Sequence, residues 1–232
     1  MNPLVRAIRH FADELGDLTQ RLSAMGHLVE ERIELAVRAL IDRDANLATT
    51  VVARDREINE LQVEIDNRCF TLLALHQPVA VDLRSIVAGA KIASDLERVG
   101  DLAVNIAEAT QRYLNHTPVK ALASIHTMAL LAQAMLHDAL DSFVSHNVGT
   151  ARSVLDRDDT LDDLKMSESR TLDSADERDK ARRGQHPFLR KPAVALSKGD
   201  DAFVAAVPDR LDEAPIVSKL LDECLRDHRC CG

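Results

Sequence analysis

The stretch KIASDLERVGDLAVNIAE, residues 91–108, carries the side chains whose spacing first suggests chemistry. Glu97, Asp101 and Asn105 recur at every fourth residue, which places two carboxylates and an amide on one stripe of a helix. Like charges at this spacing destabilise a helix by about 0.2–0.5 kcal/mol per pair. The stripe therefore predicts a compensating partner, which is solvent, a cationic side chain or a metal ion.

A second pair of the same kind lies on the preceding predicted helix. Asp55 and Asn59 are four residues apart, and a turn at residues 77–78 separates them from the first stripe. Residues equidistant from such a turn face one another, so Asp55 is expected near Asp101. Asn59 is expected near Glu97 for the same reason. Three carboxylates and an amide on two helices suit a hard cation such as Mg²⁺, Mn²⁺, Ca²⁺ or iron. The alternative is that each acidic pair is only a solvated helix face.

Other metal or catalytic motifs are weak. None of the nine histidines follows a glutamate by three residues, which removes the Glu-x-x-His element of ferritin-like di-iron sites. The sequence has no His-Glu-x-x-His, no phosphate-binding Gly-Lys-Ser/Thr and no Gly-x-Gly-x-x-Gly. A short tail tract gathers soft ligands without a standard zinc spacing, and its thiols are expected to be idle: Cys224, His228, Cys230 and Cys231.

Long helices are expected to position the acidic side chains. Residues 4–43 contain an amphipathic repeat, Asp44 is a predicted N-cap, and a second helix runs from Leu47 to Leu75. A third helix is expected over residues 79–114. Hydrophobic residues make up 46% of the chain and aromatics only 3%, with few glycines and prolines, which favours packed helices. The fold class is therefore all-α, built from bundles of long antiparallel helices.

The helical pattern returns 103 residues later. The motif R-D-x-x-[IL]-[ND]-x-L occupies residues 54–61 and again 157–164, so two three-helix units in tandem are expected. The partner of LERVGD (96–101) falls at 199–204, where GDDAFV stands, so the second bundle is incomplete.

The expected domains are therefore a first bundle (1–117), two helices of a second bundle (118–165) and a divergent tail (166–232). Four of the seven prolines follow residue 186, so we expect that tail to be partly disordered or to form short helices such as 216–227.

The formal net charge of −9 argues against nucleic acid as a partner, because phosphate binding needs a basic surface. No apolar run approaches 18 residues, so no membrane insertion is expected. Acidic residues appear too early in the N-terminal segment for a signal peptide. The expected location is cytoplasmic.

The sequence resembles the PhoU family of phosphate-uptake regulators. The resemblance rests on residues 25–40, 54–66, 72–108 and 157–164, and it covers roughly residues 1–165. It implies tandem three-helix bundles with an acidic E/D-x-x-x-D signature in each repeat, where metal clusters bind. On this chain the signature falls on Glu97 and Asp101, with Asp55 and Asn59 facing them. A second signature falls on Asp158 and Asp162, which have only half of the expected ligands.

The resemblance implies a regulator rather than an enzyme. It implies contacts with the ATPase subunit of a phosphate ABC transporter and with a sensor histidine kinase, and it implies a homodimer. Such a protein restrains phosphate uptake and keeps the phosphate-starvation response off. Two alternatives remain open: a carboxylate-bridged di-metal enzyme in a helical bundle, and a truncated, non-functional paralogue.

Overall fold

The computed structural model describes residues 3–115 and 122–184, with side chains described for 9–115 and 125–167. Every regular element in these ranges is an α-helix, which confirms the expected all-α class. The elements in chain order are α1 (Pro3–Asp42), α2 (Ala45–Ala53), α3 (Arg56–His76), α4 (Ala80–Tyr113), α5 (Leu122–Ser145) and α6 (Val148–Gly184). None of these helices is both long and apolar enough to cross a membrane.

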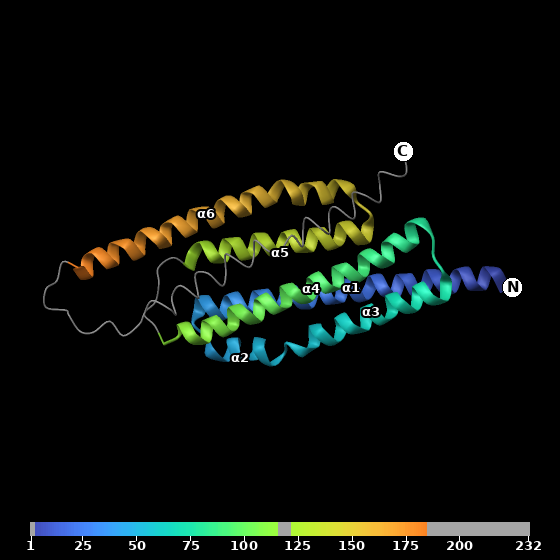
Figure 1. Cartoon of the computed structure of the whole chain (residues 1–232), viewed down its shortest axis with the longest axis horizontal. Helices are drawn as coiled ribbons and strands as arrows, with labels where there is room; N and C mark the ends of the chain where they lie inside the picture. The colour runs from blue at the N-terminus through green and yellow to red at the C-terminus, as the bar shows by residue number, and fades with distance from the viewer. Residues whose placement is uncertain (1–2, 116–121, 185–232) are drawn as a thin grey trace.

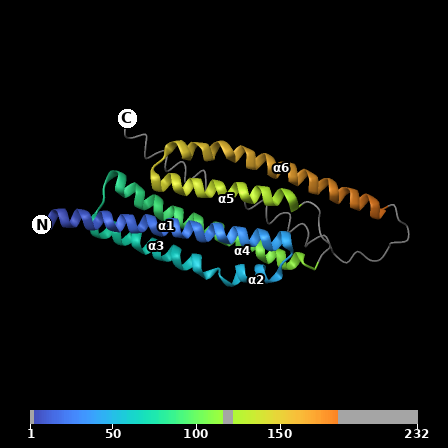
Figure 2. The same cartoon turned by 180° about the vertical axis from the view of Figure 1, so that it is seen from behind.

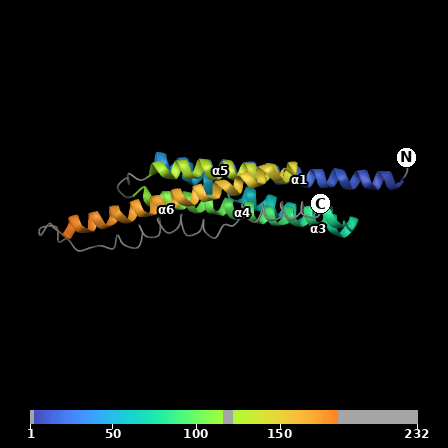
Figure 3. The same ribbon diagram turned by 90° about the horizontal axis from the view of Figure 1, so that it is seen from above.

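The helices lie roughly along one axis (Figure 1). From behind, α1 lies between α2 and α3 on one side and α5 and α6 on the other (Figure 2). From above, α5 follows the line of α1 (Figure 3), and the two helices are in contact. The chain thus forms a bundle of α1 to α4, against which the α5–α6 hairpin packs through α5.

The core is continuous from the first bundle into α5. Its largest cluster combines side chains of α1, α3 and α4 with Leu136, Leu140 and Phe143 of α5. Each fully buried leucine or isoleucine in it contributes about 1.5–3 kcal/mol of burial. Smaller clusters join α2 to α1 and α4 through alanines, and α5 to α6 through Met135, Ala139, Ala151 and Val154. The hairpin is therefore anchored to the first bundle by shared apolar packing.

The turns before α2 and α6 show the internal repeat at atomic detail. Arg43 and His146 are 103 residues apart, and both have left-handed backbones, with φ of 56° and 53°. Asp44, the predicted N-cap, accepts from the backbone N–H groups two and three residues later at 2.8 and 3.2 Å. Asn147, its repeat equivalent, accepts from the same two positions at 3.0 and 3.2 Å. The two units therefore use the same helix-entry turn.

The prediction of one continuous second helix, from Leu47 to Leu75, was wrong. The structure has two helices there, α2 and α3, which are separated by a bend. Arg32 is buried and its Nη1 donates to the carbonyl of Val51 at 3.1 Å. In a continuous helix that carbonyl accepts from the amide of Asp55. Here the Asp55 amide bonds to the carbonyl three residues back instead, at 3.3 Å. The buried guanidinium therefore replaces a helical hydrogen bond at the point where the chain bends.

The second unit lacks this break. The repeat equivalent of Arg32 is Met135, a buried side chain without a donor. Accordingly α6 runs without interruption through the equivalents of Arg54 and Asp55. It also continues to Gly184, beyond Lys165, where the change to polar composition led us to expect poorly specified structure. The remainder of the predicted tail, including the proline-rich part and residues 216–227, lies outside the described residues.

The apolar surface of the hairpin is partly uncovered. Leu130 on α5 is 53% exposed and Met166 on α6 is 54% exposed. Exposure of this kind is not specific to the hairpin, because Phe70 and Leu75 on α3 are each 69% exposed.

Candidate metal centre

Asp55 and Asn59 form the first half of the predicted site. Asp55 lies in the bend before α3, and Asn59 Nδ2 donates to Asp55 Oδ2 at 3.1 Å. The other amide atom, Asn59 Oδ1, is buried and has no hydrogen-bond partner in the described structure. A buried oxygen without a donor costs about 1–3 kcal/mol unless something satisfies it. It therefore marks a position where a cation would fit.

Glu97 and Asp101 supply the second half, from the middle of α4. Partial burial raises the pKa of Glu97, and the negative charges of Asp101 and Asp55 raise it further. Partial burial and the charge of Asp55 likewise raise the pKa of Asp101. Asp55 therefore lies close enough to interact with both carboxylates of α4. Metal binding by this set stays a prediction.

Gly100 allows α3 and α4 to approach at this point. A Cβ on Gly100 would lie 2.9 Å from Ile58 Cδ1 and 3.3 Å from Ile58 Cγ2. Ile58 is itself buried, between Asp55 and Asn59 in sequence. The missing side chain thus lets Ile58 pack directly on the α4 backbone, next to Glu97 and Asp101. Asp55 and Asp101 were expected to face one another across the turn at residues 77–78, and the contact of Ile58 with Gly100 agrees with this expectation to within one helical turn.

Two arginines lie near the bend, but both form ion pairs with carboxylates outside the predicted site. Arg32 Nη2 donates to Glu57 at 3.0 Å, and Arg54 bonds Glu57 and Glu31 at 3.0 and 3.1 Å. The hydrogen bond from Arg54 is the main reason that the pKa of Glu57 is lowered. No lysine or arginine in ranges 9–115 and 125–167 forms an ion pair with Asp55, Glu97 or Asp101. Within those ranges, no protein cation neutralises the acidic cluster, which we define as Asp55, Asn59, Glu97 and Asp101.

The second predicted pair lies on α6. Asp158 and Asp162 are exposed. Neighbouring protein atoms still remove part of the solvation of Asp158 and raise its pKa, and the charges of Asp162 and Asp159 add to the effect. The neighbouring Arg157 pairs with Asp138 on α5, as Arg54 pairs with Glu31 on α1. Residues 199–204, which the repeat offset would place opposite this pair, lie outside the described residues, as do the cysteines and histidine of the tail tract.

The sequence argument missed two sets of mixed nitrogen and oxygen ligands. Among the described residues, two groups of three have ligand atoms that all lie within 4.8 Å, and the acidic cluster is not one of them. The groups are His10, Glu14 and His76, and His27, Glu30 and His137. Both place a histidine three or four residues before a glutamate, which is the reverse of Glu-x-x-His. Only the fold shows the third ligand, because it comes from another helix.

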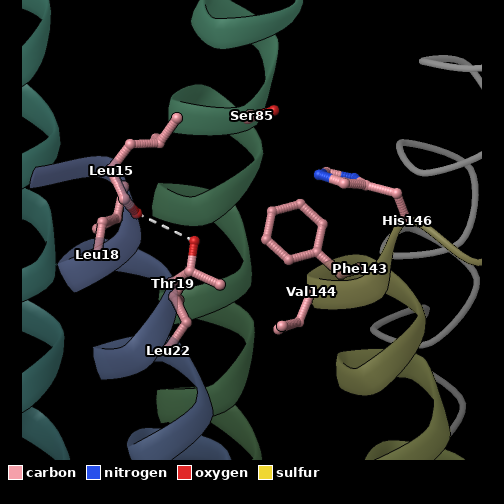
Figure 4. Close-up of a pocket in the computed structure, with 8 residues that line it drawn as sticks. All are labelled: Leu15, Leu18, Thr19, Leu22, Ser85, Phe143, Val144 and His146. Atoms are coloured by element: carbon pink, nitrogen blue, oxygen red, sulfur yellow. Dashed lines mark hydrogen bonds between the residues drawn. The ribbon is translucent and has the colours of Figure 1, made fainter. Parts of the chain in front are cut away.

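A small cavity between α1, α4 and α5 has both apolar and polar walls, and Thr19, Ser85 and His146 line its polar part (Figure 4). Its volume is about 60 Å³, and none of its lining residues belongs to the acidic cluster. Thr19 Oγ1 at its wall donates to the carbonyl of Leu15 at 3.1 Å, so this hydroxyl is already used. Sites for drug-sized ligands measure about 300–1,000 Å³, so this cavity is too small for one.

The fold and the acidic cluster define a class: repeated helical bundles with an all-oxygen donor set between two helices. The PhoU domain model matches residues 22–110 and 125–185. The chain belongs to the PhoU family.

The chain is 38% identical over 151 residues to the phosphate-specific transport system accessory protein PhoU homolog of Aquifex aeolicus, covering 65% of this chain and 68% of that protein. The homolog of the same name from Caulobacter vibrioides is 38% identical over 157 residues, covering 67% and 68%. The crystal structure of PhoU from Pseudomonas aeruginosa superposes with a TM-score of 0.80 at 29% identity, over 94% of this chain and 99% of that one. The phosphate transport system regulatory protein PhoU from Streptococcus pneumoniae superposes with a TM-score of 0.76 at 26% identity.

Proposed function

We propose that this PhoU-family protein is a metal-binding regulatory accessory protein of phosphate transport. In this proposal it acts in the cytoplasm as a homodimer. It restrains phosphate uptake and the starvation response through contacts with the transporter ATPase and a sensor histidine kinase. Family membership and the names of the relatives support the regulatory role. The relatives are named as accessory or regulatory proteins of phosphate transport rather than as enzymes.

The observation that carries the metal proposal is the buried Asn59 Oδ1 beside Asp55. Asp55, Glu97 and Asp101 would supply carboxylate oxygens, and Asn59 an amide oxygen. These donors suit a hard cation. The carboxylates are spaced too widely to fall within 4.8 Å as a set, as like charges without a cation between them should be. Partial burial raises the pKa of Glu97 and Asp101, charge repulsion raises it further, and a bound cation would remove that repulsion.

The experiment is complementation of a bacterial strain that lacks its own PhoU-family protein. The full-length chain should restore repression of a phosphate-starvation reporter when phosphate is ample. A triple variant with Asp55→Asn, Glu97→Gln and Asp101→Asn should bind less metal and lose repression. The matched control removes three exposed carboxylates from α1, α3 and α4: Glu34→Gln, Glu60→Gln and Glu108→Gln. Equal metal content in the acidic-cluster variant and the wild type would show that the site is wrong.

The same experiment separates the two alternatives. A truncated, non-functional paralogue, whose metal site is vestigial, would fail to restore repression. An enzyme would show metal-dependent turnover of a phosphate ester or of dioxygen, lost in the Glu97→Gln variant. Repression without turnover supports the regulatory proposal.

A further inference from the structure

The α1–α5 contact brings repeat-equivalent residues together. Glu30 and Gln133 are 103 residues apart, and Gln133 Nε2 donates to the backbone carbonyl of Glu30 at 3.0 Å. Contact between equivalent positions of two repeats is what a local two-fold relation between them produces. A group bound at Glu30 would therefore lie at the junction between the two units.

Two histidines approach the Glu30 carboxylate at this junction. His27, one turn earlier on α1, places Nδ1 3.5 Å from Glu30 Oε2. His137 on α5 places Nδ1 3.2 Å from Glu30 Oε1. The two imidazole rings are tilted by 38°, with centroids 6.1 Å apart. The same ring nitrogen of both histidines thus faces a different oxygen of one carboxylate, and ligand atoms of all three residues lie within 4.8 Å.

The donor set differs in kind from the acidic cluster. Two imidazoles and one carboxylate suit Zn²⁺, Co²⁺, Ni²⁺ or Cu²⁺, whereas Mg²⁺ and Ca²⁺ prefer oxygen alone. Three protein ligands of this type leave a fourth tetrahedral position for water. We propose that His27, Glu30 and His137, the inter-unit histidine site, bind a Zn²⁺-type transition-metal ion that joins the two repeats. This proposal does not depend on the proposed function.

Ion pairing alone accounts poorly for the arrangement. His27 and His137 side chains are 67% and 57% exposed, whereas Glu30 is 21% exposed. Exposed pairs of this kind contribute about 0–1 kcal/mol, and a contact of 3.5 Å is long for a hydrogen bond. No lysine or arginine of ranges 9–115 and 125–167 pairs with the Glu30 carboxylate. A partly buried carboxylate flanked by two exposed imidazoles has the composition of a ligand set.

The other histidine group is a weaker candidate. His76 Nε2 lies 2.6 Å from Glu14 Oε2, which is already a short hydrogen bond. His10 approaches the same oxygen at 3.2 Å, so both nitrogens share one acceptor. Phe11 packs on the His76 ring at 4.9 Å between centroids and restricts its rotation. The hydrogen bonds of that group are therefore already formed within the first bundle. Its three residues lie on α1 and α3, so a metal ion bound there would not join the two repeats.

The test is titration of the chelator-treated, full-length protein with Co²⁺ and Zn²⁺, followed by Co²⁺ absorption and calorimetry. His27→Ala and His137→Ala should each lower the affinity for one equivalent of metal by at least about tenfold, since loss of an outer-shell partner alone lowers metal affinity about 10–100-fold. His126→Ala is the matched control, an exposed histidine on the same helix as His137. Every protein, including the reference, carries serine at Cys224, Cys230 and Cys231 to remove competing thiolates.

The outcomes assign the site. Affinity lost in His137→Ala but kept in His126→Ala and in the acidic-cluster triple variant supports the proposal. Affinity unchanged in His137→Ala, lost only in His76→Ala, or lost equally in His126→Ala overturns it. A second readout is amide hydrogen exchange of α5. Zn²⁺ should slow it in the reference protein and leave it unchanged in His137→Ala, and no slowing in the reference protein would show that the ion does not join the repeats.

Discussion

Asn59 Nδ2 donates to Asp55 Oδ2 at 3.1 Å, and this bond leaves Asn59 Oδ1 buried without a partner in the described structure. Exchanging the two amide atoms does not help, because it would set an oxygen against the Asp55 carboxylate. Asn59 thus stabilises Asp55 through its amide N–H, while its own amide oxygen stays buried without a donor. A cation bound beside Asp55 would satisfy both groups, so the metal-free protein should be the less stable form.

Asn59→Leu tests this relationship. Leucine has a similar size, removes the unsatisfied oxygen and also removes one donor to Asp55, so these effects oppose each other. We expect the free energy of unfolding of the metal-free protein to change by less than about 1 kcal/mol. We expect stabilisation by added metal, measured as the shift in urea midpoint, to fall sharply. An undiminished shift in the variant would show that Asn59 is not a ligand.

Arg32→Met gives the first unit the residue that the second unit has at Met135. The variant removes the guanidinium that takes the carbonyl of Val51, so α2 and α3 should join into one helix. Glu57, the partner of Arg32, is 44% exposed and keeps its ion pair with Arg54, so the variant leaves no buried carboxylate unpaired and should change stability little. Metal binding at the acidic cluster should nevertheless weaken, because Asp55 moves with the repaired helix.

Arg32→Ala is the comparison for that variant, since it also removes the guanidinium but leaves a cavity. It should lose metal binding in the same way and also lose stability, by about 2–5 kcal/mol as for other buried truncations. Unchanged metal binding in Arg32→Met would show that the bend does not position Asp55.

Much of the fold was predictable because its signals are local. Asp44 caps a helix through its own neighbouring amides, and the repeat of that turn at Asn147 follows from the 103-residue offset. The facing of Asp55 and Asp101 was also predictable, since two helices joined by a short turn have one register. Tertiary contacts explain what was missed. The bend at Asp55 depends on the buried Arg32 of another helix.

The histidine site was not predictable for the same reason. His27 and Glu30 share a face of α1, but His137 joins them only because α5 packs along α1. The extension of α6 beyond Lys165 was missed because its polar composition lacks the apolar periodicity that marked the other helices.

The acidic cluster predicts a pH dependence for the metal-free protein. The pKa values of Glu97 and Asp101 are raised in the folded state, so that state binds more protons than the unfolded one. The free energy of unfolding should therefore fall as pH rises through the raised pKa values. Asp55→Asn removes the negative charge that contributes to both raised pKa values. The difference in the free energy of unfolding between this variant and the wild type should therefore shift in favour of the variant between about pH 4 and 7, by less than about 1 kcal/mol. Urea unfolding in chelator measures this difference, and a constant difference across that range would contradict it.

Cys69 should be unreactive in the folded protein. It is 2% exposed, and burial, with the charge of Asp66, raises its pKa to about 11. At pH 8 only about one thiol in a thousand is then ionised, and thiolate is the reactive form. In a variant with serine at the other three cysteines, a thiol reagent should label Cys69 only at the rate of unfolding. Rapid labelling in the absence of denaturant would show that this part of the core opens locally.

Gly26 lets α1 and α5 approach closely. A Cβ on Gly26 would lie 2.3 Å from Leu140 Cδ1, whereas nothing lies within 4 Å of a Cβ on Gly16 of the same helix. Gly16→Ala should therefore show the ordinary gain in helix propensity, about 0.5–1 kcal/mol. Gly26→Ala should instead destabilise by about 1–3 kcal/mol, because overpacking outweighs that gain.

The double variant of Gly26→Ala with Leu140→Ala decides whether the contact itself is the cause. Leu140 is buried, so Leu140→Ala alone should cost about 2–5 kcal/mol through the cavity that it leaves. The added methyl at position 26 then enters the space that leucine vacated, and the double variant should be more stable than the sum of the single changes, by about 0.5–3 kcal/mol. Urea unfolding of the four proteins gives this coupling. A coupling of zero would mean that the α1–α5 junction adjusts without strain, and that close packing at Gly26 does not hold the two units together.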